Sequence, residues 1–178
     1  MSGAAAATLR AATPADIPAI ARIYAHHVMT GLASFEEVPP SAGEIGRRHA
    51  EVQGHGLPWI VALDGGGAVC GYAYAAPYRP RAAYRFTLED SIYVAEDAMR
   101  RGIGRALLTR LMADCAAANY RQIVAVIGDS ANTASVGLHE RLGFRRVGLL
   151  PAVGFKHGRW VDIVLMQRDL GDGAATMP

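Results

Sequence analysis

The chain has 178 residues, of which 51% are hydrophobic and 19% are charged, a balance typical of a globular protein and not of a disordered one. Its length favours one domain with a sizeable core, ordered from about residue 8 to about residue 170 and ending in flexible tails. The net charge of +2 is small and spread along the chain without a run of Lys or Arg, so we expect no nucleic-acid partner.

Compartment and redox state follow from equally simple features. No apolar stretch approaches the roughly 20 residues that cross a membrane, and the opening MSGAAAATLR is short and has no basic leader. Cys70 and Cys115 are too few for a disulfide framework, and we expect both to be buried as small hydrophobic side chains. The sequence therefore predicts a cytoplasmic protein without a membrane partner.

The first third of the chain predicts one short strand and two helices. The Thr-Pro-Ala-Asp sequence at residues 13–16 supplies an N-cap, a proline at the first helical position and an acid in the first turn. A Ser-Ala-Gly-Glu capping box at residues 41–44 begins the second helix. From these signals we expect a strand over residues 8–12, helices over about residues 14–30 and 41–53, and a loop over residues 31–40.

The rest of the chain predicts several strands and two more helices. Apolar runs bounded by Gly-rich turns indicate strands over residues 59–63, 68–75, 87–94, 122–127, 145–150 and 160–167, with a turn at residues 156–158 before the last of them. Apolar residues at helical spacing follow a Gly-rich turn: Leu107, Leu108, Leu111, Met112 and Cys115. Another helix is expected over residues 132–142, where Gly143 ends it.

The Gly-rich turn lies in AEDAMRRGIGRALLTRL, residues 95–111. Helix entries of this kind bind phosphates, because the N–H groups of the first turn lack intrahelical partners. A Walker loop is excluded, since Gly104 is followed by Arg105 and not by Lys and Ser or Thr. A dinucleotide fingerprint expects a third glycine where Leu107 stands, and a turn used only for packing helix on sheet is the alternative without a ligand.

Other segments favour a third ligand, the pyrophosphate of coenzyme A. The order of elements and the segments RRGIGRALL and NTASVGLHERLGF resemble the acetyl-CoA-binding half of the GNAT acetyltransferase superfamily, with Met99 in place of its usual Gln or Arg. The resemblance implies an α/β (α+β) fold, in which a mixed, mostly antiparallel, twisted sheet of about seven strands is flanked by about four helices. It also implies acetyl-CoA as co-substrate, with a cradle of backbone N–H groups from residues 100 to 105.

Three further segments narrow the resemblance. TLEDSIYV, VAVIGDSANTASVGLHERLGF and VGFKHGRWVDIVLMQRDL resemble the phosphinothricin N-acetyltransferases and the related enzymes that acetylate methionine sulfoximine and methionine sulfone. The likeness runs from about Leu9 to about Leu170. It implies transfer of an acetyl group to the α-amino group of a small amino-acid-like acceptor, a homodimer, and a role in herbicide resistance or metabolism that the sequence leaves open.

The resemblance assigns the chemistry to two residues. Glu89 is the expected general base, acting directly or through a water, and apolar neighbours would favour it by raising its pKa. His139 stands where much of the superfamily has a tyrosine, and it is expected either to protonate the departing thiolate or to orient the sulfur. The alternatives are an exposed or capping carboxylate for Glu89 and a helix-surface histidine for His139.

The remaining site residues fall into two sets. For acetyl-CoA, the resemblance implies the backbone of the strand and turn, and the start of the next helix: Ile92, Tyr93, Val94, Arg100, Arg101, Gly102, Ile103, Gly104, Arg105, Asn132 and His139. For the acceptor, it implies arginine forks for anionic oxygens, aromatic side chains for methylenes and polar groups on the strand: Phe35, Arg79, Arg81, Tyr84, Glu89, Asp90 and Ser91.

No metal is expected, because the remaining histidines show no metal-ligand spacing with Cys or acids: His26, His27, His49, His55 and His157. Two classes of function stay open. One is an N-acetyltransferase, whose acceptor is an amino acid, another small amine or a peptide N-terminus. The other is a non-catalytic sensor of acyl-CoA on the same fold, against which the presence of both Glu89 and His139 argues.

Overall fold

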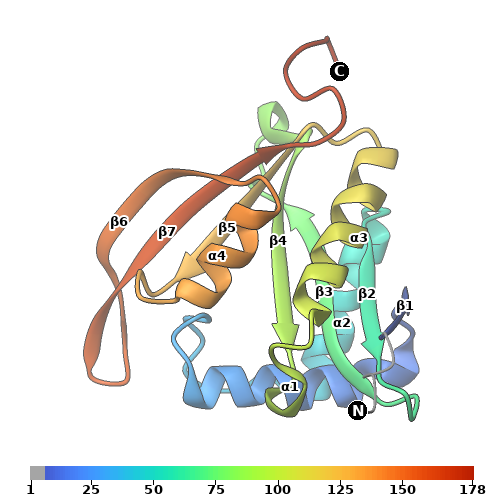
Figure 1. The fold of residues 1–178 in the computed structure, drawn as a ribbon, viewed down its shortest axis with the longest axis vertical. Coiled ribbons are helices and arrows are strands. Elements are labelled where there is room, and N and C mark those ends of the chain that lie inside the picture. Colours follow the sequence, from blue (N-terminus) through green and yellow to red (C-terminus); the bar gives the residue numbers. More distant parts are fainter. Residues whose placement is uncertain (1–6) are drawn as a thin grey trace.

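The computed structural model describes residues 7–178, in which one seven-stranded sheet is accompanied by four α-helices (Figure 1). The first six residues of the expected N-terminal tail lie outside the described residues. The strands are β1 (Thr8–Ala11), β2 (Trp59–Leu63), β3 (Val69–Pro77), β4 (Thr87–Val94), β5 (Gln122–Gly128), β6 (Arg145–Lys156) and β7 (Arg159–Asp169). The helices are α1 (Ile17–Thr30), α2 (Ala42–Gly54), α3 (Ile103–Ala117) and α4 (Thr133–Arg141).

The sheet is mixed, as the sequence predicted. Its strand order is β1-β2-β3-β4-β5-β7-β6, and only β4 and β5 pair in parallel. These two strands pair over a short stretch that ends with Asp90 opposite Ala125, and β4 then continues to Val94 while β5 continues to Gly128. Figure 1 shows the two strands diverging from a common end. The fold therefore opens a splay between residues 91–94 of β4 and 126–128 of β5.

The core lies between the sheet and its helices. The apolar stripe predicted for α3 is fully buried at Leu107, Leu108, Leu111 and Cys115. A Cβ on Gly71 of β3 would lie 3.1 Å from Ile103, so the glycine allows α3 to approach the sheet closely. Burial of each such leucine contributes about 1.5–3 kcal/mol. Helix α3, whose first turn carries the Gly-rich sequence, is therefore held firmly on the sheet.

The hairpin of β6 and β7 is longer than the sequence predicted. We expected the first strand to end at residue 150, but pairing with β7 resumes beyond an irregularity and extends β6 to Lys156. At the irregularity Ala152 has a φ of 50° and donates its N–H to Asp162 Oδ1 at 2.8 Å. The expected turn is confirmed, because His157 and Gly158 both have positive φ, as a two-residue hairpin turn requires.

Two further observations complete the fold. Residues 171–174 form turns, and Arg121 lies 3.1 Å from the Thr176 hydroxyl and 3.5 Å from the Asp172 carboxylate. Within residues 7–178 no helix has the length and apolar character needed to cross a membrane.

Candidate active site

Strand β4 presents successive side chains to opposite faces of the sheet, and this alternation separates two of the predicted site residues. Tyr93 contacts Tyr24 and His27 of α1, which defines one face, and Glu89 and Ser91 share it. Asp90 lies on the other face, where its carboxylate contacts α4. Glu89 therefore remains on the predicted acceptor side. Asp90, which we expected beside it, does not.

The Glu89 carboxyl group, the predicted general base, has a raised pKa. It is half-buried, and burial raises its pKa, with the Asp90 charge adding to the effect and the Arg79 charge opposing it. A raised pKa brings the proton affinity of a carboxylate closer to that needed to deprotonate an ammonium group. Tyr74 lies on the same face, where burial raises the pKa of its phenol and the negative charge of Glu89 adds to the effect.

Alternate residues of β4 direct their backbone N–H and C=O groups toward the splay. Ala95 donates its N–H to Cys70 and Tyr78 donates to Thr87, so the odd-numbered residues of β4 direct their backbone groups toward β3. Ile92 and Val94 consequently direct theirs toward the splay. Of the three residues predicted to bind the pantetheine arm, Tyr93 is the exception. Its backbone faces β3 and its side chain packs among aromatic rings.

A histidine that sequence reasoning did not assign stands at the end of this edge. His27 of α1 lies with Nε2 2.9 Å from the Val94 carbonyl oxygen, and burial lowers its pKa, so its neutral form donates this hydrogen bond. The bond leaves the N–H groups of Ile92 and Val94 as the donors that point into the splay. No local pattern marked His27, because its partner lies 67 residues away in the sequence.

The Gly-rich turn has the backbone of an anion cradle. Arg100 has a φ of 60° and Gly102, the N-cap of α3, has a φ of 80°. The first helical hydrogen bond runs from Ala106 N–H to the Gly102 carbonyl, so the N–H groups of residues 103–105 have no intrahelical partner. A backbone that alternates between right-handed and left-handed conformations directs such N–H groups toward one anion. The predicted phosphate-binding residues therefore lie together at one helix N-terminus.

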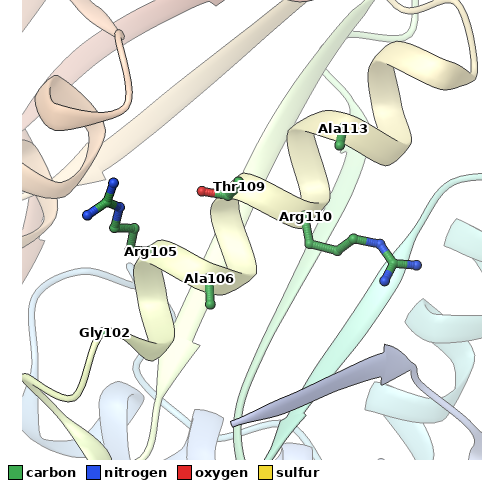
Figure 2. A pocket seen from close by; sticks show the side chains of 6 residues that line it. All are labelled: Gly102, Arg105, Ala106, Thr109, Arg110 and Ala113. Carbon is green, nitrogen blue, oxygen red and sulfur yellow. The ribbon is translucent and has the colours of Figure 1, made fainter. Parts of the chain in front are cut away.

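A surface cavity of about 540 Å³ begins at this turn and continues along α3 (Figure 2). It is lined by Gly102, Arg105, Ala106, Thr109, Arg110 and Ala113. Figure 2 shows the Arg105 and Arg110 side chains leaving α3 on opposite sides. Arg110 pairs with Asp114 at 2.8 Å, whereas the Arg105 side chain extends from the other side of α3.

Helix α4 carries Asn132 and His139, the other two residues predicted to contact coenzyme A. Asn132 is the N-cap, and its side-chain oxygen accepts the Ser135 N–H at 3.1 Å. His139 is buried and not on the helix surface. Its Nδ1 lies 2.8 Å from the Ser135 carbonyl oxygen and its Nε2 lies 3.0 Å from Asp90 Oδ2. Both imidazole nitrogens are thus engaged within the protein.

Beside the residues of β4, the predicted acceptor residues come from the segment between β3 and β4 and from the loop after α1. Arg79 lies over the Tyr78 ring at 5.1 Å, and its charge reaches Glu89, whose pKa it lowers against the effect of burial. Arg81 is exposed at the start of a short 3₁₀ helix, residues Ala82–Tyr84. Tyr84 packs edge-on against Tyr78 at 5.7 Å. The structure therefore brings the Arg79 charge near Glu89, the predicted base, and leaves Arg81 on the surface.

Phe35 is held by a loop that the rest of the fold fixes in place. Its ring lies against Gly154 of β6, where a Cβ would be 2.1 Å from the ring, and the backbone of Leu32 lies against Gly128 of β5. Lys156, which is buried, donates from Nζ to the Ser34 carbonyl at 2.7 Å. The sequence pattern assigned no individual role to Lys156 or Gly154, and the segment VGFKHGRWVDIVLMQRDL that contains both was the available signal.

The same loop is tied to the aromatic face of the sheet. Tyr24 OH lies 2.8 Å from Ser34 Oγ and donates to Glu36 Oε1 at 2.9 Å, and Glu36 in turn pairs with Arg48 of α2 at 2.6 Å. A loop fixed at this many points presents the Phe35 ring with little freedom.

Among residues 7–178 no three His, Cys, Asp or Glu side chains are grouped so that they can hold a metal ion.

Comparison with known proteins agrees with this geometry over almost the whole chain. The Acetyltransferase (GNAT) family matches residues 21–144. A phosphinothricin N-acetyltransferase of Alcaligenes faecalis is 56% identical over 173 residues, which are 97% of this chain and 87% of that protein. An L-methionine sulfoximine/L-methionine sulfone acetyltransferase of Pseudomonas paraeruginosa is 40% identical over 167 residues, 92% of this chain and 95% of that protein.

A solved structure extends the likeness to three dimensions. The crystal structure of a GNAT superfamily phosphinothricin acetyltransferase from Sinorhizobium meliloti in complex with AcCoA has a TM-score of 0.95 with this chain at 51% identity. The match covers 97% of this chain and 93% of that one. The fold predicted from the sequence is thereby confirmed, and the chain belongs to the acetyltransferase (GNAT) family.

Proposed function

We propose that the chain transfers an acetyl group from acetyl-CoA to the α-amino group of a small amino-acid-like acceptor of the phosphinothricin, methionine sulfoximine or methionine sulfone type. The observation that carries this proposal is Glu89, a half-buried carboxylate with a raised pKa on the strand that borders the splay. The likeness to enzymes named for these acceptors supports the substrate class.

Acetyl-CoA binds by its pyrophosphate to the backbone N–H groups of residues 100–105, with Arg105 beside it. The open N-terminus of α3 and the positive φ of Arg100 and Gly102 support this assignment. The pantetheine arm then pairs with β4 as an added strand pairs with a sheet edge, using the groups that Ile92 and Val94 direct into the splay. The acetyl thioester comes to the narrow end of the splay.

The reaction needs a base, an oxyanion site and a leaving group. Glu89 takes a proton from the acceptor ammonium group, directly or through a water, and the freed amine attacks the thioester carbonyl. A backbone N–H on the splayed edge of β4 stabilises the oxyanion that forms. The tetrahedral intermediate collapses when the carbon–sulfur bond breaks, its electron pair leaves on sulfur, and the nitrogen loses its second proton to solvent. His139 lies on the coenzyme side of the strand and acts on that departing thiolate.

The acceptor binds on the Glu89 face of β4. Arg79 and Arg81 bind its carboxylate and its tetrahedral oxygens, Ser91 adds a hydroxyl, and Phe35 and Tyr84 pack its methylenes. The exposure of both aromatic rings supports such a role, because Phe35 is 38% and Tyr84 is 37% exposed. We leave Asp90 out of this set, because its carboxylate lies on the opposite face.

We further propose a cytoplasmic homodimer that uses the hairpin of β6 and β7. This hairpin extends away from α1, α2 and α3 (Figure 1). It exposes a group of large apolar side chains: Val147, Leu149, Leu150, Val153, Phe155 and Trp160. Exposed apolar patches of this kind mark contact surfaces. Sedimentation equilibrium tests the proposal, since a chain that keeps the mass of a monomer at high concentration contradicts it.

The central experiment measures thiol release from acetyl-CoA by the purified protein with a panel of acceptors. The panel holds phosphinothricin, methionine sulfoximine, methionine sulfone, methionine, unrelated small amines and a peptide with a free N-terminus. We expect acetylation to be fastest with the first three. Preference for an unrelated amine or the peptide contradicts the substrate class, and acetyl-CoA binding without turnover on any acceptor identifies a sensor.

A further inference from the structure

Asp90 occupies a special position in strand β4. It is the last residue that pairs with β5, and beyond it the two strands separate. Its carboxylate faces away from Glu89, toward α4, where it meets His139 at 3.0 Å. A buried pair of ionisable groups therefore stands at the vertex of the splay.

Hydrogen bonding determines how this pair is protonated. The Ser135 carbonyl oxygen only accepts hydrogen bonds, so Nδ1 of His139 carries a proton. Nε2 and the Asp90 carboxyl group then share a second proton across their 3.0 Å contact. Burial opposes a charged imidazole, but the hydrogen bond and charge of Asp90, together with the Ser135 carbonyl, outweigh it and raise the pKa of His139. These contacts favour the imidazolium form of His139 beside Asp90.

Apart from His139, the described surroundings of Asp90 provide few groups that stabilise a charged carboxylate. Its side chain is 3% exposed, and its second oxygen, Oδ1, is buried without a hydrogen-bond partner among the described residues. The neighbouring ionisable group on α3 is Cys115, whose thiol stays neutral because burial, with the Asp114 and Asp90 charges, raises its pKa to about 12. Glu89 precedes Asp90 on β4 and faces the other side of the sheet. An uncharged residue would satisfy packing here at lower cost, because burying a charged carboxylate is unfavourable.

We propose that Asp90 is a positioning residue for acetyl transfer, which keeps His139 protonated and oriented at the vertex of the splay. This inference rests on the proposed function. As the carbon–sulfur bond breaks, its electron pair leaves on sulfur, and the imidazolium charge stabilises the thiolate. The first amine proton passes to Glu89 and the second leaves to solvent, so His139 begins and ends the step protonated. Asp90 acts through His139 and does not touch the reacting atoms.

The test compares Asp90→Asn with a matched control, Asp114→Asn, which removes the other carboxylate near Cys115 but has no contact with His139. NMR titration of the His139 ring gives its pKa in the resting protein, and the pH dependence of kcat gives the alkaline limb. With Asp90→Asn we expect the His139 pKa and the alkaline limb to move together to lower pH. We also expect kcat above neutral pH to fall about tenfold or more, with the KM for acetyl-CoA nearly unchanged. Asp114→Asn should change none of these.

Each other result overturns the proposal in a recognisable way. A purely structural role for Asp90 would lower thermal stability while the alkaline limb stayed in place. An unchanged His139 pKa in Asp90→Asn would show that the carboxylate does not hold the charge. If that variant fails to fold, the wild-type protein still decides, because its alkaline limb must coincide with the titration of His139. A wild-type protein inactive on every acceptor contradicts the proposed function, and the inference falls with it. If the wild-type protein is active but its alkaline limb does not coincide with the titration of His139, the inference is wrong and the proposed function stands.

Discussion

The Phe35 ring occupies the space that a side chain on Gly154 would fill, with a built Cβ only 2.1 Å from ring atom Cε2. Phe35 and Gly154 are far apart in the sequence, yet each constrains what can occupy the position of the other. Gly154 must lack a side chain for the ring to lie where it does, and the ring prevents any larger residue in β6 at that point. The proposed acceptor pocket is therefore shaped in part by the absence of a side chain at Gly154.

Gly154→Ala should displace the Phe35 ring and weaken acceptor use. Overpacking of this kind costs about 1–3 kcal/mol, so we expect kcat/KM for methionine sulfoximine to fall about tenfold or more, with the KM for acetyl-CoA nearly unchanged. Steady-state kinetics with each substrate varied in turn measures both. Gly148→Ala is the control in the same strand, because its Cβ would lie 3.6 Å from Leu165, an ordinary contact. Equal kinetics for the two variants would contradict the role of Gly154.

The turn into α3 gives a prediction about coenzyme affinity. Gly102 has a φ of 80° with open space around it, so Gly102→Val should act through backbone strain of about 1–2 kcal/mol. Gly104→Val should act by contact, because a Cβ there already lies 3.3 Å from Leu138 of α4. Calorimetry with acetyl-CoA should show weaker binding for both variants. Met99→Ala, at an exposed position, should bind almost normally. Folded glycine variants with unchanged affinity would remove the cradle.

Glu89→Gln should separate binding from chemistry. The amide keeps the shape of the side chain but does not accept a proton, so kcat should fall about 100-fold or more while acetyl-CoA still binds. Because burial raises the pKa of Glu89, its basic form is lost as pH falls through a value above that of an ordinary glutamate. The wild-type acid limb should lie there, and Glu89→Gln should flatten it. Glu51→Gln, at an exposed position on α2, is the control. A normal acid limb in Glu89→Gln would transfer the base role elsewhere.

The sequence predicts a structural feature well when the residues that form it are close together in the chain, and poorly when they are far apart. The Ser41 N-cap and the apolar stripe of α3 are local signals, and the structure confirms both, with Ser41 accepting the Glu44 N–H at 3.2 Å. The reciprocal half of the expected capping box is absent, because the Glu44 carboxylate pairs with Arg47 and Arg48. Period-two alternation in β4 is local too, and it already places Glu89 and Asp90 on opposite faces. The resemblance, and not the strand pattern, was the basis for expecting Asp90 on the acceptor side. Contacts such as Lys156 with Ser34, 122 residues apart, leave no local pattern.

The start of α1 carries a prediction about stability. Asp16 accepts hydrogen bonds from both Arg10 terminal nitrogens, at 2.6 and 2.7 Å, and from the Thr13 N–H at 2.8 Å. The Arg10 hydrogen bonds, followed by those from Thr13, outweigh burial and hold the pKa of Asp16 well below its usual range. Asp16→Asn should lower the free energy of unfolding by about 1.5–3 kcal/mol at neutral pH.

Urea denaturation at several pH values checks the sign of this effect. A group whose pKa is lowered in the folded state stabilises the protein above its unfolded pKa, and the stabilisation declines as pH falls toward the folded value. The difference between wild type and Asp16→Asn should therefore shrink below about pH 4. A difference that stays constant through that range would show that packing, and not the carboxylate charge, matters at this position.

The last prediction concerns the acceptor and distinguishes two arginines of one loop. Losing a bidentate guanidinium contact to a charged group costs about 1.5–3 kcal/mol, so Arg79→Ala and Arg81→Ala should each lower kcat/KM for methionine sulfoximine about ten- to a hundredfold. Only Arg79→Ala should also move the acid limb to higher pH, because the Arg79 charge lowers the pKa of Glu89 and its removal leaves burial unopposed. Arg85→Ala, whose guanidinium stacks on Phe86 at 4.7 Å, is the control.

The sulfur oxygens of the acceptor test the same contacts from the other side. Methionine lacks them, so it should be a markedly poorer acceptor than methionine sulfone in the wild-type protein. In the arginine variant that has lost the contact to these oxygens, the sulfone should lose most of its advantage, whereas the variant that has lost the carboxylate contact should be slower with both. Kinetics with the two acceptors on the two variants therefore assigns each guanidinium to one end of the substrate. Equal use of methionine and its sulfone by the wild type would refute the substrate assignment and leave the acetyltransferase fold untouched.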